Sequence, residues 1–90
     1  MKIIFDPRKR AATLEKRRVD FRDAEIVFAG PTYTIPDERL PYPEERFLTV
    51  GRLSGRMVIV IWTPVADARR IISMRKANDR EQARYSHRLG

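Results

Sequence analysis

The chain has 90 residues, no cysteine and one histidine, and its 19 basic and 12 acidic residues give a net charge of +7. A chain of this length buries about 60–65% of its unfolded surface, so we expect residues 1–90 to form a single domain with a small core. The composition excludes disulfides and zinc sites made of cysteine and histidine, and no apolar run resembles a signal peptide or a membrane span, so we expect a cytoplasmic protein that uses no cofactor and no membrane.

The first third of the chain predicts a short strand and two helices. Residues 2–5 form an apolar run, and Asp6 and Pro7 then supply the cap and first residue of a helix that we expect to end near Arg17. A second helix is expected to begin at Asp20 and to end at a Gly-Pro pair. The first helix offers only a thin apolar face, made of Ala11, Ala12 and Leu14.

The rest of the chain predicts four strands and a final helix. A proline-rich, acidic loop separates the first two of these strands, and a Ser-Gly pair predicts a two-residue hairpin between the second and third. Asn78 and Glu81 have the spacing of a capping box and predict the start of the last helix. The four strands are expected at residues 32–35, 46–53, 57–62 and 68–75.

These elements give the order β-α-α-β-β-β-β-α, which indicates an α+β fold. Four consecutive strands predict an antiparallel meander. The two N-terminal helices are expected to cover one face of this sheet because their apolar stripes must be buried, and a C-terminal helix completes the fold. Part of the opposite face is then left for function.

The basic residues concentrate at the two ends of the sequence. Residues 1–18 and residues 69–90 each contain seven basic and two acidic residues, whereas residues 19–68 carry a net charge of −3. Ends that meet in space would form a basic patch able to bind nucleic acid through counterion release. The alternative is that scattered surface charges serve only solubility.

The last strand carries several of these basic groups. Strict alternation along it places Arg69 and Arg75 on one face and Arg70 on the other. Inward cations on a sheet usually indicate a salt bridge, a charge that protects an edge, or a ligand site. The four basic residues Arg69, Arg70, Arg75 and Lys76 favour a phosphate site, because planar guanidinium groups make bidentate contacts. Charges that protect a sheet edge from aggregation are the competing interpretation.

RNA cleavage without a metal ion requires a base, an acid and cations that stabilise the phosphorane. Arginine serves the third role well, but it does not deprotonate near neutral pH and is a poor base. The candidates for proton transfer are Lys16, Lys76, Glu81, Tyr85 and His87.

Several motifs resemble those of the BrnT toxins. They are F-D-P-R-K-R-A-A at residues 5–12, D-F-x-x-A-x-x-V-F at 20–28, R-F-x-x-x-G at 46–51, and R-I-I-S-M-R-K-A at 70–77 with E-x-x-x-Y at 81–85. The resemblance implies a ribonuclease toxin of a type II toxin–antitoxin pair with a RelE-like fold. It also implies a BrnA-like antitoxin with a ribbon-helix-helix part, through which the complex would bind operator DNA and repress its own operon.

The matched R-I-I-S-M-R-K-A block and the basic ends together give an expected RNA site. The residues expected at the catalytic centre are Lys16, Arg70, Arg75, Lys76 and Tyr85. The residues expected to bind RNA around it are Arg17, Arg46, Arg69, Ser73 and Arg84.

One stretch departs from the family pattern. Where BrnT toxins usually show N-x-x-K-H-G, this chain has Thr13, Arg17 and Arg18 in place of the asparagine, histidine and glycine. The change removes a side chain that titrates near neutral pH, and it puts a side chain where glycine tolerates a positive φ. A non-catalytic module that binds RNA or an antitoxin is therefore an alternative, and so is DNA binding through a helix-turn-helix at residues 7–28.

Overall fold

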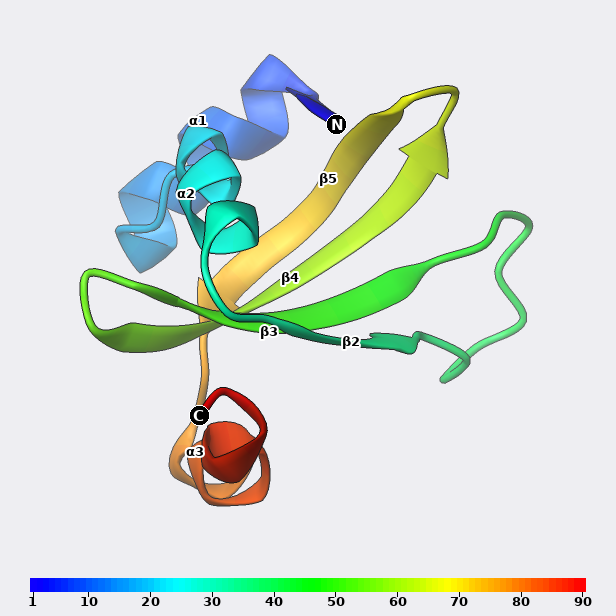
Figure 1. Cartoon of the computed structure of the whole chain (residues 1–90). Coiled ribbons are helices and arrows are strands. Elements are labelled where there is room, and N and C mark those ends of the chain that lie inside the picture. Colours follow the sequence, from blue (N-terminus) through cyan, green and yellow to red (C-terminus); the bar gives the residue numbers. More distant parts are fainter.

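The computed structural model describes residues 1–90 and shows a five-stranded sheet with helices on both faces (Figure 1). The predicted α+β class is confirmed, and the elements follow one another as β1 (Lys2–Phe5), α1 (Pro7–Arg17), η1 (Phe21–Asp23), α2 (Ala24–Ala29), β2 (Tyr33–Pro36), β3 (Phe47–Leu53), β4 (Arg56–Val65), β5 (Ala68–Lys76), α3 (Asp79–Tyr85) and η2 (Ser86–Arg88). The strand order is β1-β5-β4-β3-β2.

The sheet is mixed rather than purely antiparallel. Strands β2 to β5 form an antiparallel meander, but β1 lies beside β5 and runs parallel to it, with Ile4 opposite Arg70. A parallel pair needs a long connection, and here the whole of the intervening chain supplies it. This geometry places β1 and β2 at the two edges of the sheet.

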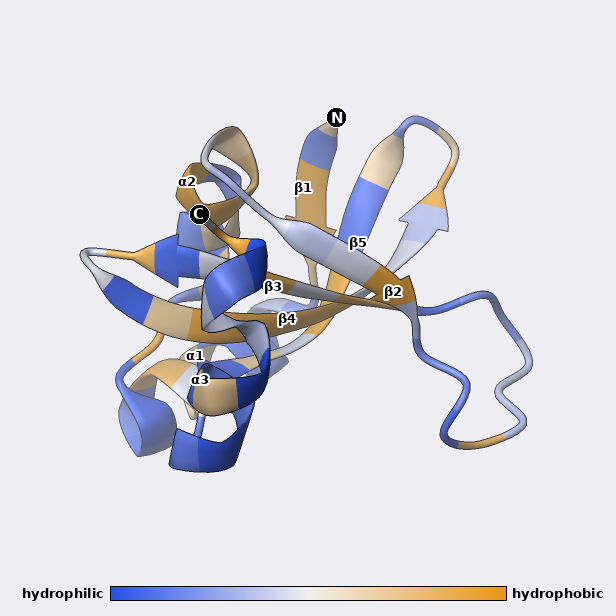
Figure 2. Cartoon of the chain, turned by 60° about the horizontal axis from the view of Figure 1, so that its bottom comes forward, coloured by the Kyte–Doolittle hydropathy of each residue, from blue (hydrophilic) through white to orange (hydrophobic).

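Strand β4 lies at the centre of the sheet, as its continuous apolar run predicts. It pairs with β3 and β5, and Figure 2 shows it as largely hydrophobic against a mostly hydrophilic loop between β2 and β3. The predicted two-residue hairpin joins β3 to β4, since Ser54 and Gly55 adopt φ values of 52° and 78°. Positive φ at both positions is the geometry whose twist matches that of paired strands.

Two clusters of apolar side chains hold the layers together, one on each face of the sheet. The first cluster lies on the side of the sheet that α2 covers, which we call the α2 face. There, Val58, Val60 and Trp62 of β4 pack against Phe21 and Val27. The helix approaches β3 closely at Gly51. A Cβ there would lie 2.5 Å from Cγ1 of Val27.

The second cluster lies on the opposite side of the sheet, which we call the α3 face because the C-terminal helix packs there. Met57, Ile59 and Ile61 of β4 pack with Tyr85 and Leu89 at the C-terminus. The predicted capping box at the start of α3 is confirmed, with reciprocal bonds of 2.8 Å and 3.0 Å between Asn78 and Glu81. The helix covers only part of this face.

The prediction that α1 buries an apolar face against the sheet is wrong. The helix has the predicted bounds, yet none of its residues is buried and Leu14 is 38% exposed. Polar contacts fix it instead. Asp6 caps its start by accepting from the Arg8 amide at 2.8 Å, and Arg10 makes two hydrogen bonds to the carboxylate of Asp20, at 2.8 Å and 3.0 Å.

Two features mark the end of α1, a perturbed carboxylate and a left-handed cap. The hydrogen bonds from Arg10 lower the pKa of Asp20 to about 2. Arg18 then ends the helix in the left-handed region, with φ 59° and ψ 34°, and its amide donates to the Leu14 carbonyl. A residue with a Cβ therefore occupies a conformation that glycine adopts without strain.

None of the helices combines the length and apolar character needed to cross a membrane.

Candidate functional site

A β-bulge in β5 decides which basic side chains share a face of the sheet. Opposite the continuous strand β4, Ser73 pairs with Ile61 and Ile71 pairs with Trp62. Ile72 therefore has no partner, and the alternation of side chains shifts by one position at this point. The strict alternation predicted for residues 68–75 is wrong for this reason.

The bulge places Arg70 and Arg75 together on the α3 face. Arg70 lies opposite Thr63, and Arg75 lies opposite Ile59 of the α3-face core. The other two basic residues of the strand point to the α2 face: Arg69 stacks on Phe28, and Lys76 lines a groove beside Arg18. The sheet therefore separates Lys76 and Arg69 from the predicted catalytic arginines.

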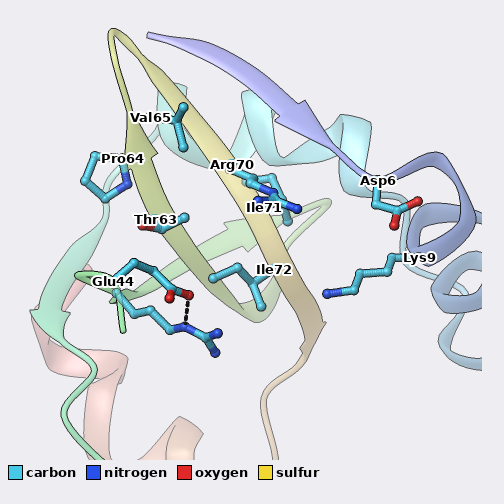
Figure 3. A pocket seen from close by; sticks show the side chains of 10 residues that line it. Asp6, Lys9, Glu44, Thr63, Pro64, Val65, Arg70, Ile71 and Ile72 are labelled. Atoms are coloured by element: carbon cyan, nitrogen blue, oxygen red, sulfur yellow. Dashed lines mark hydrogen bonds and ion pairs between the residues drawn. The ribbon is translucent and has the colours of Figure 1, made fainter. Parts of the chain in front are cut away.

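A cavity of about 340 Å³ opens on the α3 face near Arg70 (Figure 3). It lies between the bulge, the start of α1 and the loop between β2 and β3, and Lys9 reaches toward Ile72 from the side opposite Glu44. Its volume is within the range of small-ligand sites. The lining residues are Asp6, Lys9, Glu44, Arg46, Thr63, Pro64, Val65, Arg70, Ile71 and Ile72.

An ion pair forms the loop side of the cavity. Glu44 accepts from Nε of Arg46 at 2.8 Å, and the Arg46 guanidinium also lies 3.9 Å from the centroid of the Tyr42 ring. The Thr63 hydroxyl donates to the Glu45 carbonyl, which ties the loop to β4. The second carboxylate oxygen of Glu44 makes no hydrogen bond within the chain.

A second ion pair fixes the beginning of the same loop. Asp37, whose side chain is 1% exposed, accepts two hydrogen bonds from Arg39 at 2.7 Å and 3.0 Å, and these bonds lower the pKa of the Asp37 carboxyl. The Asp37 amide donates to the Arg46 carbonyl at 2.8 Å. Both ends of the loop are therefore held in place. Arg46 is positioned by the hydrogen bond to its backbone carbonyl and by the ion pair of its side chain with Glu44.

Arg75 is already neutralised by the chain itself. Its guanidinium makes two hydrogen bonds to Glu81, at 2.7 Å and 2.8 Å. They lower the pKa of the Glu81 carboxyl, and the positive charge of Arg39 lowers it further. Because Glu81 also caps α3, this pair joins the last strand to the C-terminal helix.

The remaining predicted site residues are dispersed. Lys16 and Arg17 are exposed in the last turn of α1 and do not line the cavity. Ser73 is half-buried on the α3 face. Tyr85 is buried, with its ring centroid 5.9 Å from that of Tyr33. Of the predicted residues, only Arg46 and Arg70 line the cavity. Arg84 lines a separate hollow at the C-terminus, with Tyr33, Ile35, Tyr85, His87 and Arg88.

Sequence reasoning missed Glu44 and did not separate Lys9 from the other basic residues of its helix. Lys9 lies two positions after Pro7, the first residue of the helix. Its closeness in sequence to the end of β1 could have indicated that it lies beside the sheet. Glu44 lies in a loop without periodicity, and no local pattern brings it to β5. The cavity combines cations with the carboxylates of Glu44 and Asp6, each of which has one oxygen without a hydrogen bond within the chain. This arrangement is suited to binding phosphate and accepting a proton.

The chain contains no cluster of three or more acidic or histidine side chains that could hold a metal ion. In a comparison with protein families, the sequence profile described as "Ribonuclease toxin, BrnT, of type II toxin-antitoxin system" matches residues 5–81. No individual curated protein matches the chain.

Proposed function

The chain belongs to the BrnT family of ribonuclease toxins of type II toxin–antitoxin systems, and we propose that it cleaves RNA without a metal ion in the cavity on the α3 face. The observation that carries this proposal is the placement of Arg70. It is an exposed guanidinium without a carboxylate partner, and it lines the same cavity as Lys9 and the Glu44–Arg46 pair. We propose that residues 1–90 act as one toxin domain and that the fold is RelE-like.

In this proposal, the cations of the cavity bind the phosphate. Arg70 offers a guanidinium that no internal group occupies, and Arg46 keeps donors free because only its Nε is bonded to Glu44. Two planar donors around one phosphate would stabilise the extra charge of a phosphorane. Arg75 contributes indirectly, by holding α3 against the end of β5.

In this proposal, Glu44 and Lys9 transfer the protons. In the proposed step, the free oxygen of Glu44 takes the proton of a ribose 2′-hydroxyl, and the 2′-oxygen attacks the adjacent phosphorus. The bond to the 5′-oxygen breaks, and Lys9 gives that oxygen a proton. The products are a 2′,3′-cyclic phosphate and a 5′-hydroxyl, so no water or metal ion enters this step.

The family also supports a proposal for the partner and the cellular setting. A type II toxin has a protein antitoxin, and we propose that it is a BrnA-like ribbon-helix-helix protein. The complex would bind operator DNA through the antitoxin and repress its own operon. Cleavage of RNA would inhibit translation, and we propose that the toxin acts in the cytoplasm.

Two measurements test the proposed activity. Induction of the chain without its antitoxin should arrest growth, and the purified chain should cleave RNA in EDTA. Loss of cleavage in EDTA that Mg²⁺ restores would refute the metal-free mechanism. Normal growth with abundant soluble protein and no cleavage of structured or unstructured RNA would refute the ribonuclease.

A second candidate is a non-catalytic module that only binds RNA or the antitoxin. It is favoured by the closed Arg75–Glu81 pair, by the burial of Tyr85, and by Arg17 in place of the family histidine. The Arg17→His variant separates the two candidates. A silent wild-type chain that gains cleavage with this variant would indicate an inactivated toxin.

A further inference from the structure

One half-buried arginine has no carboxylate partner. The chain contains four half-buried arginines, and Arg10, Arg46 and Arg75 each make an ion pair with an acidic side chain. Arg69 makes none, and its Nε is buried without any hydrogen-bond acceptor. Buried donors are almost always satisfied in folded proteins, so this exception calls for a physical explanation.

Aromatic rings hold the Arg69 guanidinium in place. Its central carbon lies 3.9 Å from the centroid of Phe28 and 5.2 Å from that of Trp62, which is the geometry of a cation–π contact. Burial lowers the pKa of Arg69. The rings fix the position of the cation but leave its in-plane donors unused.

Arg69 lines a small groove on the α2 face, where β1, β5 and α2 meet. The groove has a volume of about 190 Å³, and four of its six lining residues are hydrophobic. Met1 is 62% exposed, and β1 pairs with β5 only, so the outer edge of β1 has no strand partner. The lining residues are Met1, Ile3, Glu25, Phe28, Ala29 and Arg69.

We propose that this groove binds a segment of the antitoxin in which an acidic side chain is flanked by apolar ones, with the carboxylate bonded to Arg69. The proposal rests on the proposed function only in taking an antitoxin as the partner. A guanidinium fixed on aromatic rings is preorganised for a bidentate contact with a carboxylate. This contact would use the two Nη groups of Arg69, because its Nε is buried. The apolar lining would bury the neighbouring side chains, and the toxin's net charge of +7 attracts an acidic partner.

The groove fits a peptide better than an RNA strand. Its volume accommodates about one side chain, and its walls are largely apolar. It also lies on the face opposite Arg70 and the candidate RNA cavity. A contact at Arg69 therefore supplies affinity for the antitoxin without taking part in cleavage.

The test is the affinity of purified toxin variants for the ribbon-helix-helix protein encoded by the adjacent reading frame, measured by calorimetry. We expect Arg69→Ala to weaken binding about tenfold or more, as for an interface hot spot, and Arg69→Lys to recover only part of the loss. Glu25→Lys should strengthen binding, because it removes a negative charge beside the groove. Arg80→Ala, which changes an exposed arginine of α3, is the control and should leave the affinity unchanged.

Cells provide a second readout. Toxin carrying Arg69→Ala should still arrest growth, while co-expressed antitoxin should rescue it less well than it rescues the wild type. Unchanged affinity of both the Arg69→Ala and the Glu25→Lys variants for the antitoxin would overturn the proposal. An Arg69→Ala variant that loses RNA cleavage but keeps its affinity for the antitoxin would also overturn it. If Arg69→Ala does not fold, Glu25→Lys alone decides. The affinities do not depend on cleavage, so a chain without ribonuclease activity would refute only the proposed function.

Discussion

Arg70 and Arg75 project from the same face of β5 although five positions separate them, because Ile72 forms a bulge between them. Their surroundings differ sharply. Arg75 makes two hydrogen bonds to Glu81, whereas Arg70 is exposed and has no acidic partner. One arginine therefore stabilises the C-terminal helix, and the other is free to bind a ligand.

Removal of Glu81 should destabilise the protein through two losses at once. Glu81→Ala breaks the ion pair with Arg75 and half of the capping box, and we expect a loss of about 2 kcal/mol in the free energy of unfolding, measured with urea. Asp79→Ala is the control, since Asp79 lies in the same first turn without a side-chain hydrogen bond. Equal unfolding midpoints for the two variants would show that the pair contributes no stability.

Glu44→Gln tests the proposed base. The amide keeps the shape of the side chain but cannot accept the 2′-hydroxyl proton, so we expect single-turnover cleavage to fall about 10²-fold or more. RNA affinity should stay the same or rise, because a negative charge leaves the cavity. Glu38→Gln, on the same loop but outside this cavity, is the control. A rate unchanged from that of the wild type would assign the base elsewhere.

Arg18→Gly should stabilise the chain. Arg18 ends α1 at φ 59°, a conformation that costs a residue with a Cβ about 1–2 kcal/mol relative to glycine. Part of this gain is lost because glycine raises the entropy of the unfolded chain, so we expect a net increase of about 0.5–1 kcal/mol and a higher Tm. Arg17→Gly, one residue earlier within the helix, should instead lower the Tm. A lower Tm for Arg18→Gly would mean that its side chain contributes more than the strain costs.

The stability of the chain should depend on Asp20 in acid. The folded-state pKa of Asp20 is about 2, whereas an unfolded aspartate titrates near pH ~4. The contribution is therefore complete above about pH 4 and disappears as the pH falls toward 2. Asp20→Asn should unfold at lower urea concentrations than the wild type at pH 6, and the difference should shrink below pH 4. A difference that stays constant across this range would contradict the assignment.

Local sequence signals were sufficient for most elements of the fold. The helix expected from Asp20 instead begins as the 3-10 turn Phe21–Asp23 before α2, and the final 3-10 turn Ser86–Arg88 was not predicted. The cap at Asp6, the Ser54–Gly55 hairpin and the Asn78–Glu81 capping box depend on residues near one another in sequence, and the structure contains all three. The parallel placement of β1 beside β5 joins segments more than sixty residues apart, and no local signal encodes it.

The candidate site was harder to predict for a related reason. A bulge is one unpaired residue in a ladder, and the sequence around Ile72 contains no glycine or proline that would mark one, so both arginines could not be assigned to one face. The position of Glu44 depends on a loop held by Thr63 and by the Asp37–Arg39 pair. Composition indicated a basic site, but tertiary contacts selected which cations form it.

The most direct test of the central claim compares RNA cleavage by Arg70→Ala and Lys76→Ala under single-turnover conditions. Both variants remove one exposed cation from β5, but Arg70 lines the cavity on the α3 face and Lys76 lies on the α2 face. We expect Arg70→Ala to slow cleavage about 10²–10³-fold, as for the loss of one donor to a developing charge, and Lys76→Ala to cleave at nearly the wild-type rate. Equal losses for the two variants, or a larger loss for Lys76→Ala, would contradict an RNA site on the α3 face.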